Sequence, residues 1–164
     1  MKANFIIRAA LQSDAVELKK LFQNTVLAIN RRDYSQAEVE DWASCGDDLS
    51  NIENMIKTHY FIVAVNQQSE IVGFSSITPQ GYLHSMFVHK DFQGEGIATI
   101  LLNEIEQYAI TNGIIRITSE VSLTARPFFE KKGYIVEEEQ KRKANQLSLT
   151  NFWMAKQTIC PKNL

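Results

Sequence analysis

Residues 82–112 read YLHSMFVHKDFQGEGIATILLNEIEQYAITN. The segment starts with an apolar strand over 82–89 and continues through a short turn that contains Gly94 and Gly96. It ends in a long amphipathic helix. The backbone N–H groups of such a turn, with the unpaired N–H groups and positive dipole end of the helix, favour anion binding. The segment therefore predicts a phosphate-binding turn.

Two well-known phosphate motifs do not fit this turn. A Walker A loop requires Lys and then Ser or Thr after its second glycine, but Ile97 and Ala98 follow Gly96. A dinucleotide-binding turn requires Gly or Ala three residues after its second glycine, where Thr99 stands. The remaining pattern is Gln93-x-x-Gly96-x-Ala98. An ordinary strand-to-helix turn with glycine as punctuation fits the same pattern.

Composition limits the classes of protein that the chain can represent. Its 164 residues are 45% hydrophobic and 22% charged, which predicts a single domain over 1–164. A net charge of −2 argues against nucleic-acid binding by a basic surface. We also expect no membrane segment and a cytoplasmic location, because signal-like and spanning apolar runs are absent. No metal site is expected either. Cys45 and Cys160 lack metal-ligand spacing and are interpreted as reduced thiols.

The periodicity of apolar residues predicts an alternation of strands and helices. We expect helices to start at Asp14 (with Glu17 completing a capping box), at Ser35, near Leu49, after Gly96 and at Thr124. The predicted strands are 4–9, 60–65, 70–78, 82–89, 114–121, 134–142 and 146–157. The strand–helix–strand unit over 82–121 predicts a parallel pair with a right-handed crossover. This order indicates an α/β fold, a mixed sheet with helices on both faces.

Four stretches of the chain together resemble the GCN5-related N-acetyltransferase (GNAT) superfamily, and the segment 33–43 is similar to its small uncharacterised bacterial members. The four stretches are IIRA at 6–9 with Asp14, FVHKDFQGEGIA at 87–98, the pattern S-x-x-A-x-x-FF-x-x-x-GY at 122–134, and FWMAK at 152–156. The resemblance covers nearly the whole chain. It implies a mostly antiparallel mixed sheet in which the fourth and fifth strands are parallel and splayed apart.

The resemblance also implies acetyl-CoA as co-substrate. In GNAT proteins the pantetheine arm lies between the fourth and fifth strands and pairs with the backbone of the fourth. By this similarity Met86, Phe87 and Val88 would bind the arm, and one of their N–H groups would polarise the thioester carbonyl. The pyrophosphate would be held by the backbone of Gln93, Gly94, Glu95, Gly96, Ile97, Ala98 and Thr99, so the Glu95 side chain can point to water.

His84 is the candidate general base, because an imidazole titrates near neutral pH and can accept a proton from an ammonium group. Some GNAT members carry a catalytic His or Glu on this strand. Strand alternation places His84 on one face with Tyr82 and Met86. A structural histidine is the alternative interpretation, and His59 and His89 are interpreted as surface or strand-end residues.

The general acid is where the chain departs from the family pattern. Many GNAT enzymes carry Asn-x-x-Ala-x-x-x-Tyr, in which Asn contacts pantetheine and the Tyr hydroxyl lies near the sulfur. Here Ser122 and Phe129 occupy those two positions. Phe129 has no proton to donate, so either CoA leaves as a thiolate or a hydroxyl of Tyr134 or Tyr82 takes over.

The acceptor pocket is expected from the first helices, with Arg31, Tyr34 and Trp42 as candidate residues. A solvated helix end with Trp42 in the core is the alternative. The favoured function is direct transfer of acetyl from acetyl-CoA to the amine of a small molecule or peptide. The alternatives are a CoA-binding sensor or scaffold without turnover, and an acyltransferase that uses another acyl-CoA or an alcohol. Dimers are common among such proteins.

Overall fold

The computed structural model describes residues 4–158, so Cys160 lies outside the described residues. The elements follow the predicted order and differ from the predicted bounds by one to three residues at most ends. They are β1 (Ile6–Ala9), η1 (Gln12–Asp14), α1 (Ala15–Ala28), η2 (Asn30–Arg32), α2 (Gln36–Ser44), α3 (Leu49–Thr58), β2 (Tyr60–Val65), β3 (Ile71–Ile77), β4 (Leu83–Val88), α4 (Ile97–Thr111), β5 (Arg116–Ser122), α5 (Arg126–Lys131), β6 (Ile135–Lys143) and β7 (Ser148–Gln157).

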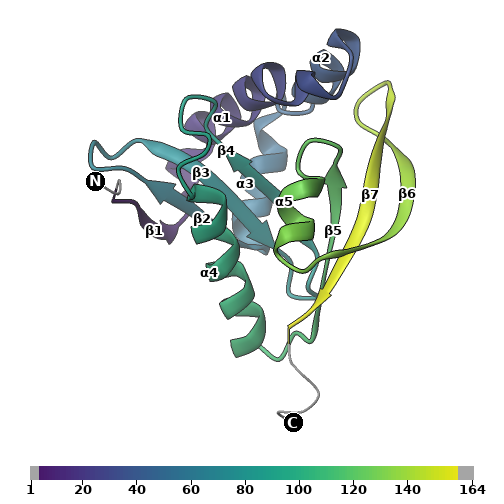
Figure 1. Ribbon diagram of the computed structural model, residues 1–164. Coiled ribbons are helices and arrows are strands. Elements are labelled where there is room, and N and C mark those ends of the chain that lie inside the picture. Colours follow the sequence, from purple (N-terminus) through teal and green to yellow (C-terminus); the bar gives the residue numbers. More distant parts are fainter. Residues whose placement is uncertain (1–3, 159–164) are drawn as a thin grey trace.

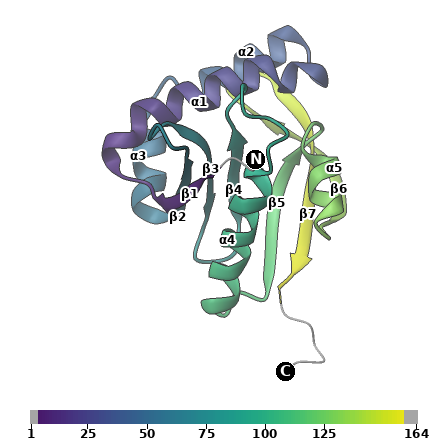
Figure 2. The ribbon, with the colours of Figure 1, turned by 60° about the vertical axis from the view of Figure 1, so that its left-hand side comes forward.

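The strands form two antiparallel sheets that meet at one point. One sheet has the order β1-β2-β3-β4, and the other has the order β5-β7-β6. A single parallel bridge joins Tyr82 to Thr118, beside the hydrogen bond from Thr118 N–H to the Gly81 carbonyl at 3.0 Å. Beyond this bridge β4 and β5 diverge (Figures 1 and 2). The mixed sheet with a splayed parallel pair is therefore confirmed.

Helices cover both faces of the first sheet, because side chains of β2 alternate between two cores. Ile62 and Ala64 pack in the core that contains the buried face of α4. Phe61 and Val63 pack on the opposite side, in the core that contains Leu18 of α1. Figure 2 shows α1 and α3 on one side of the strands and α4 on the other. The gap between β4 and β5 is thus walled by helices on both sides.

The predicted helix starts were partly correct. Ser35 caps α2 as expected, since its side chain accepts the Glu38 N–H at 3.1 Å. The capping box of Asp14 and Glu17 is wrong. Asp14 instead accepts the Arg8 guanidinium at 2.8 Å, and this hydrogen bond lowers its pKa. Glu17 accepts the Ile71 N–H at 2.9 Å. Both carboxylates join α1 to the sheet rather than capping it.

Candidate active site

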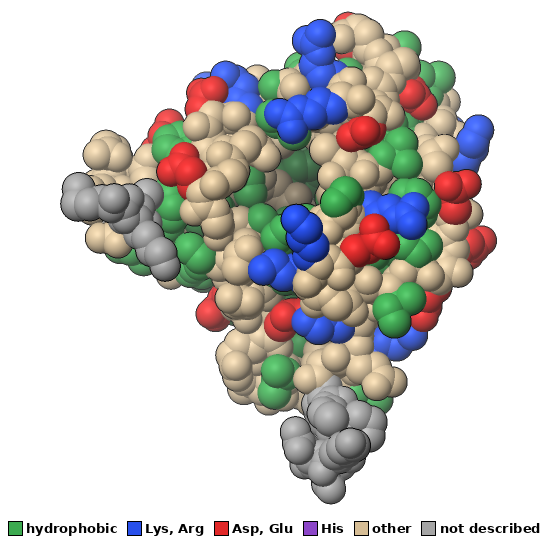
Figure 3. Space-filling view, viewed as in Figure 1, with side chains coloured by type: hydrophobic (Ala, Val, Ile, Leu, Met, Phe, Trp, Pro, Cys, Tyr) green, Lys and Arg blue, Asp and Glu red, His purple; other side chains and the backbone are tan. Residues whose placement is uncertain are grey.

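A cavity of about 1000 Å³ lies where β4 and β5 diverge. Its walls come from α1, α2, α3, β4, the turn before α4, β5, α5 and the strands β6 and β7. In the view of Figure 3 a hollow opens on the surface, and Lys and Arg side chains flank it. The volume is at the upper end of the range for small-molecule sites.

The edge of β4 that faces this gap presents backbone N–H groups, whereas its Val88 carbonyl already accepts the side chains of Thr25 and Gln93. The His89 N–H is donated to the Val72 carbonyl at 2.8 Å, across the β3–β4 pair. Because N–H groups alternate along an antiparallel strand, those of Met86 and Val88 point the other way, toward β5. The backbone of Phe87 pairs with β3 instead. Of the three expected pantetheine contacts, Met86 and Val88 have the required orientation and Phe87 does not.

The turn before α4 presents several N–H groups at one end of the cavity. Gly96 is the N-cap of α4 with φ 84°, a conformation that L side chains rarely adopt, and a Cβ there would meet no atom within 4 Å. The N–H groups of Ile97, Ala98 and Thr99 stand in the first turn of α4, where no helical acceptor exists. These features suit an anion in front of the turn.

The side chains of the turn have separate tasks. Gln93 lines the cavity, and its amide donates to the Val88 carbonyl at 2.8 Å, which ties the turn to the end of β4. Gly94 also lines the cavity and has open space around it. Glu95 is exposed and is not among the lining residues, as expected if the turn acts through its backbone.

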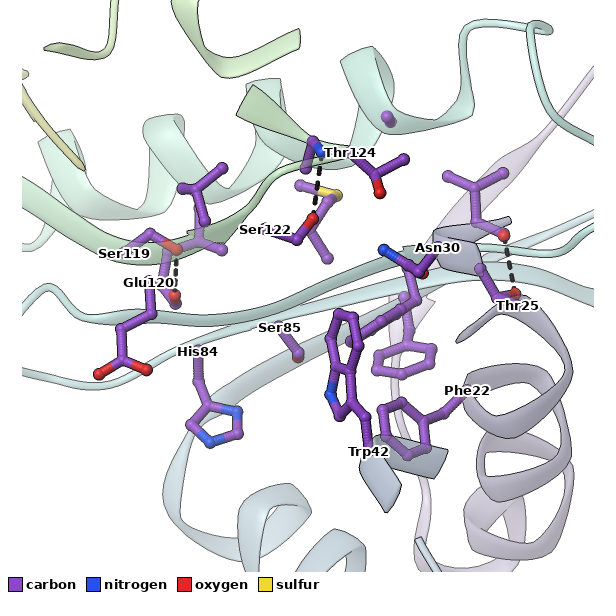
Figure 4. Close-up of a pocket in the computed structure, with 18 of the residues that line it drawn as sticks. Phe22, Thr25, Asn30, Trp42, His84, Ser85, Ser119, Glu120, Ser122 and Thr124 are labelled. Carbon is purple, nitrogen blue, oxygen red and sulfur yellow. Dashed lines mark hydrogen bonds between the residues drawn. The ribbon is translucent and has the colours of Figure 1, made fainter. Parts of the chain in front are cut away.

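Ser122, rather than Thr124, makes the side-chain hydrogen bond at the start of α5. Ser122 Oγ accepts the Ala125 N–H at 3.1 Å and so holds the start of α5, which corrects the expected capping by Thr124 (Figure 4). Among buried side-chain N and O atoms of residues 4–158, Thr124 Oγ1 is the one without a hydrogen-bond partner. Both residues line the cavity. A buried hydroxyl without a partner is costly, so Thr124 Oγ1 is an unsatisfied group in the wall of the cavity.

His84 is the extra residue of a β-bulge in β4. Ser76 pairs with Ser85 and Ile77 pairs with Leu83, so His84 is inserted between the two pairs. A bulge re-aims side chains. Leu83 and Met86 both pack in the core of α4, whereas His84 lies beside the end of α3 and projects into the cavity (Figure 4). The expectation that His84 shares a face with Met86 is therefore wrong, because the bulge breaks the alternation.

Two aromatic neighbours surround the His84 imidazole. Its ring centroid lies 5.5 Å from that of His59 and 5.7 Å from that of Tyr82, which meets it edge-on. The His84 side chain is exposed, and the surface it exposes faces the cavity. Desolvation by the surrounding walls, with a smaller contribution from the nearby His59, lowers the pKa of His84. A lowered pKa keeps the ring neutral at pH 7, and a neutral imidazole can accept a proton.

The two candidate acids differ in position. Tyr82 lines the cavity, and burial together with the charge of Glu120 raises its pKa to about 12, so the phenol keeps its proton at neutral pH. Tyr134 is 2% exposed, donates to Glu106 at 2.8 Å, and is not among the lining residues. Phe129 is also buried and packs edge-on against Tyr134. Only Tyr82 of these three offers a hydroxyl to the cavity.

The expected acceptor residues separate into three cases. Arg31 is exposed and does not line the cavity. Tyr34 does, but its hydroxyl is occupied, since it donates to the Thr150 carbonyl at 2.6 Å and accepts the Leu123 N–H at 3.0 Å. Trp42 lines the cavity and is partly buried, with its ring near Tyr34. Of the three expected acceptor residues, Trp42 is therefore the one that lines the cavity with a ring still partly accessible to a ligand.

Many lining residues were not anticipated as site residues, among them His59, Thr124 and Asn30. His59 was interpreted as a surface or strand-end residue; it does stand directly before β2, and it also lines the cavity beside His84. No local pattern distinguishes these residues, because each reaches the site through the packing of distant segments. Among residues 4–158 no group of three His, Cys, Asp or Glu side chains is placed to hold a metal ion, and no helix is long and apolar enough to cross a bilayer.

Comparison with known proteins agrees with this geometry. The profile of the acetyltransferase (GNAT) domain matches residues 30–156. The chain belongs to the GNAT acetyltransferase family. The uncharacterized N-acetyltransferase YafP of Escherichia coli K12 is 27% identical over 151 residues, which is 92% of this chain and 95% of YafP.

Solved structures of GNAT proteins share the fold. A GCN5-related N-acetyltransferase from Rhodopseudomonas palustris has a TM-score of 0.91 and 27% identity, over 96% of this chain and 98% of its own. The PaiA N-acetyltransferase of Thermoplasma acidophilum, in complex with coenzyme A, has a TM-score of 0.78 and 19% identity, over 94% and 99%. This GNAT protein is therefore an acetyltransferase enzyme.

Proposed function

We propose that this GNAT acetyltransferase transfers acetyl from acetyl-CoA directly to a primary amine, with His84 as general base. The observation that carries the proposal is that the groups needed for acetyl transfer meet in one cavity. The edge of β4, the N–H groups of the turn 93–99 and the bulged His84 all open into it. The PaiA protein with coenzyme A and a YncA protein with acetyl-CoA share the fold, which supports this choice of co-substrate.

The roles of the residues follow from the chemistry of acyl transfer. Acetyl-CoA supplies an activated acyl group as a thioester. His84 removes a proton from the ammonium form of the acceptor, and the neutral amine then attacks the thioester carbonyl. As the carbon–sulfur bond breaks, the nitrogen loses its second proton to solvent and becomes the amide. The N–H groups of Met86 and Val88 are the donors available to the developing oxyanion. Tyr82 holds a proton at neutral pH and is the proposed donor to the leaving thiolate.

The cofactor contacts divide by chemistry as well. The backbone of Gly94, Gly96, Ile97, Ala98 and Thr99 binds the pyrophosphate, while Gln93 shapes the turn. Ser122 and Thr124 both line the cavity and are the two hydroxyl residues proposed to contact the pantetheine arm. We expect a single domain working in the cytoplasm. We favour direct transfer because Cys45 is a poor nucleophile: burial, with the nearby charge of Asp41, raises its thiol pKa.

Thiol release from acetyl-CoA, measured across a panel of primary amines and alcohols, tests the proposal. Release should depend on an amine, and His84→Gln should lower kcat by about 100-fold or more while CoA affinity stays unchanged. CoA binding without release on any acceptor would instead support a sensor. Release with alcohols or with longer acyl-CoA only would support the remaining alternative.

A further inference from the structure

The part of the cavity on the α1–α2 side is lined by aromatic rings. We call the residues Phe22, Tyr34, Trp42 and Phe87 the aromatic chamber. The Phe87 ring lies 5.1 Å from that of Phe22 and 6.1 Å from that of Trp42, and Trp42 lies 5.8 Å from Tyr34, all edge-on. The rings come from α1, α2, β4 and the loop before α2. All four residues line the cavity.

The chamber lies on the acceptor side of the cofactor path. Phe87 points to the cores of α1 and α2, away from α4, whereas the turn 93–99 opens at the start of α4. In Figure 4 His84 lies on one side of the cavity, with Ser85 between it and the rings of Trp42 and Phe22. A molecule that fills the chamber can therefore extend toward His84.

Charge limits what can bind there. Among the described residues that line the cavity, Glu120 is the one carboxylate, and it accepts the Arg142 side chain at 3.2 Å. The other charged lining residue is Lys143. A polyamine would bring several ammonium groups into walls that have no free counter-ion, and such burial is unfavourable. The walls therefore suit an acceptor with one amine, which loses its charge when it is acetylated.

The chamber also offers one polar group. Asn30 is 6% exposed and its side chain lines the cavity near Trp42 (Figure 4). No hydrogen bond joins the Asn30 amide to another side chain or to backbone within residues 4–158. An amide of this kind can bond a hydroxyl or ring nitrogen on the body of the acceptor.

The outer wall of the chamber is fixed. Asp41 of α2 accepts the N–H groups of Asn145, Gln146 and Leu147 at 2.9, 3.0 and 3.1 Å, which holds the β6–β7 turn against α2. A closed wall favours a small molecule over a polypeptide segment.

From these observations we propose that the acceptor is an arylalkyl monoamine. Its aromatic ring occupies the aromatic chamber and its alkyl chain carries the amine to His84. This inference rests on the proposed function for the transfer step, but the binding preference is independent of turnover.

Three amines test the two parts of this proposal, the preference for an aromatic ring and the preference for a single amine. They are 2-phenylethylamine, its saturated analogue 2-cyclohexylethylamine, and spermidine. Binding is measured by calorimetry in the presence of CoA, and kcat/KM by thiol release. Phenylethylamine should bind about three- to tenfold more tightly than the cyclohexyl analogue, as expected for aromatic contacts beyond area burial. Spermidine should bind at least tenfold more weakly than phenylethylamine, because its additional ammonium groups find no free carboxylate in the cavity walls.

Trp42→Leu keeps apolar bulk and removes the ring, so it should bring the ratio of phenylethyl to cyclohexyl affinity to about one. Tyr108→Leu is the matched control. Tyr108 stacks on Tyr60 outside the cavity, so its loss should leave the ratio unchanged. Thermal unfolding checks that both variants are folded.

The outcomes distinguish this inference from the proposed function. Preferential binding of phenylethylamine without turnover of any amine would contradict the transferase mechanism and support the chamber assignment. Turnover that favours spermidine, equal affinity for the aryl and cyclohexyl amines, or no binding of phenylethylamine would each overturn the inference.

Discussion

Gly96 is the position where one methyl group tests the phosphate turn most cleanly. Its φ is 84°, and an added Cβ would meet no protein atom within 4 Å. Gly96→Ala should therefore cost only backbone strain, about 1–2 kcal/mol, which lowers Tm by about 2–8 °C in a chain of this size. The methyl group would occupy open space beside the turn, where the proposal places the phosphate.

Gly113→Ala supplies a matched control. Gly113 has φ 73° and the same open surroundings, but it ends α4 and does not line the cavity. Both variants should lose similar stability. Only Gly96→Ala should lose CoA affinity, by at least about tenfold, because each hydrogen bond to a charged phosphate contributes about 1.5–3 kcal/mol.

Calorimetric titration with CoA, well below both unfolding transitions, gives the comparison. Equal dissociation constants for wild type, Gly96→Ala and Gly113→Ala would refute the assignment of the turn. A loss of affinity in both variants would assign the effect to strain rather than to the blocked phosphate.

Three further predictions concern the walls of the cavity. The folded-state pKa of His84 is lowered, so the acid limb of kcat/KM should have its midpoint below pH 6.5, and His84→Gln should remove that limb from the rate profile. Thr124→Val removes the unpartnered hydroxyl. Apo stability, followed by thermal unfolding, should be unchanged or higher, whereas CoA affinity should fall about two- to tenfold, and unchanged affinity would show that no ligand uses this group. Tyr34→Phe leaves the Leu123 N–H and the Thr150 carbonyl without their partner, so denaturant unfolding should report a loss of about 1–3 kcal/mol; a loss within error of zero would argue that water replaces the phenol.

The order of elements and the position of the turn between β4 and α4 could be predicted because their signals are local. The apolar periodicity of a helix or strand, and the glycine that follows or precedes it, can be recognised within a window of about 15 residues. Ser35 illustrates this, since its capping partner Glu38 is three residues away. Gly96 likewise stands where the strand-to-helix turn requires a positive φ.

The arrangement of side chains around the cavity could not be predicted in the same way. The bulge at His84 is a property of the pairing between β3 and β4, and strand alternation alone gives the wrong face. Tyr34 bonds Leu123, which is 89 residues away. Tyr134 looked available as an acid, but its hydroxyl faces Glu106 on α4. Such partners depend on tertiary packing.

Product analysis of a reaction with acetyl-CoA and a primary amine tests the central claim most directly. Mass spectrometry should find one N-acetylated amine for each CoA thiol released by the wild-type enzyme. His84→Gln should bind CoA normally and form product about 100-fold more slowly or less. Tight CoA binding without an acetylated product from any primary amine, or full activity in His84→Gln, would contradict the account.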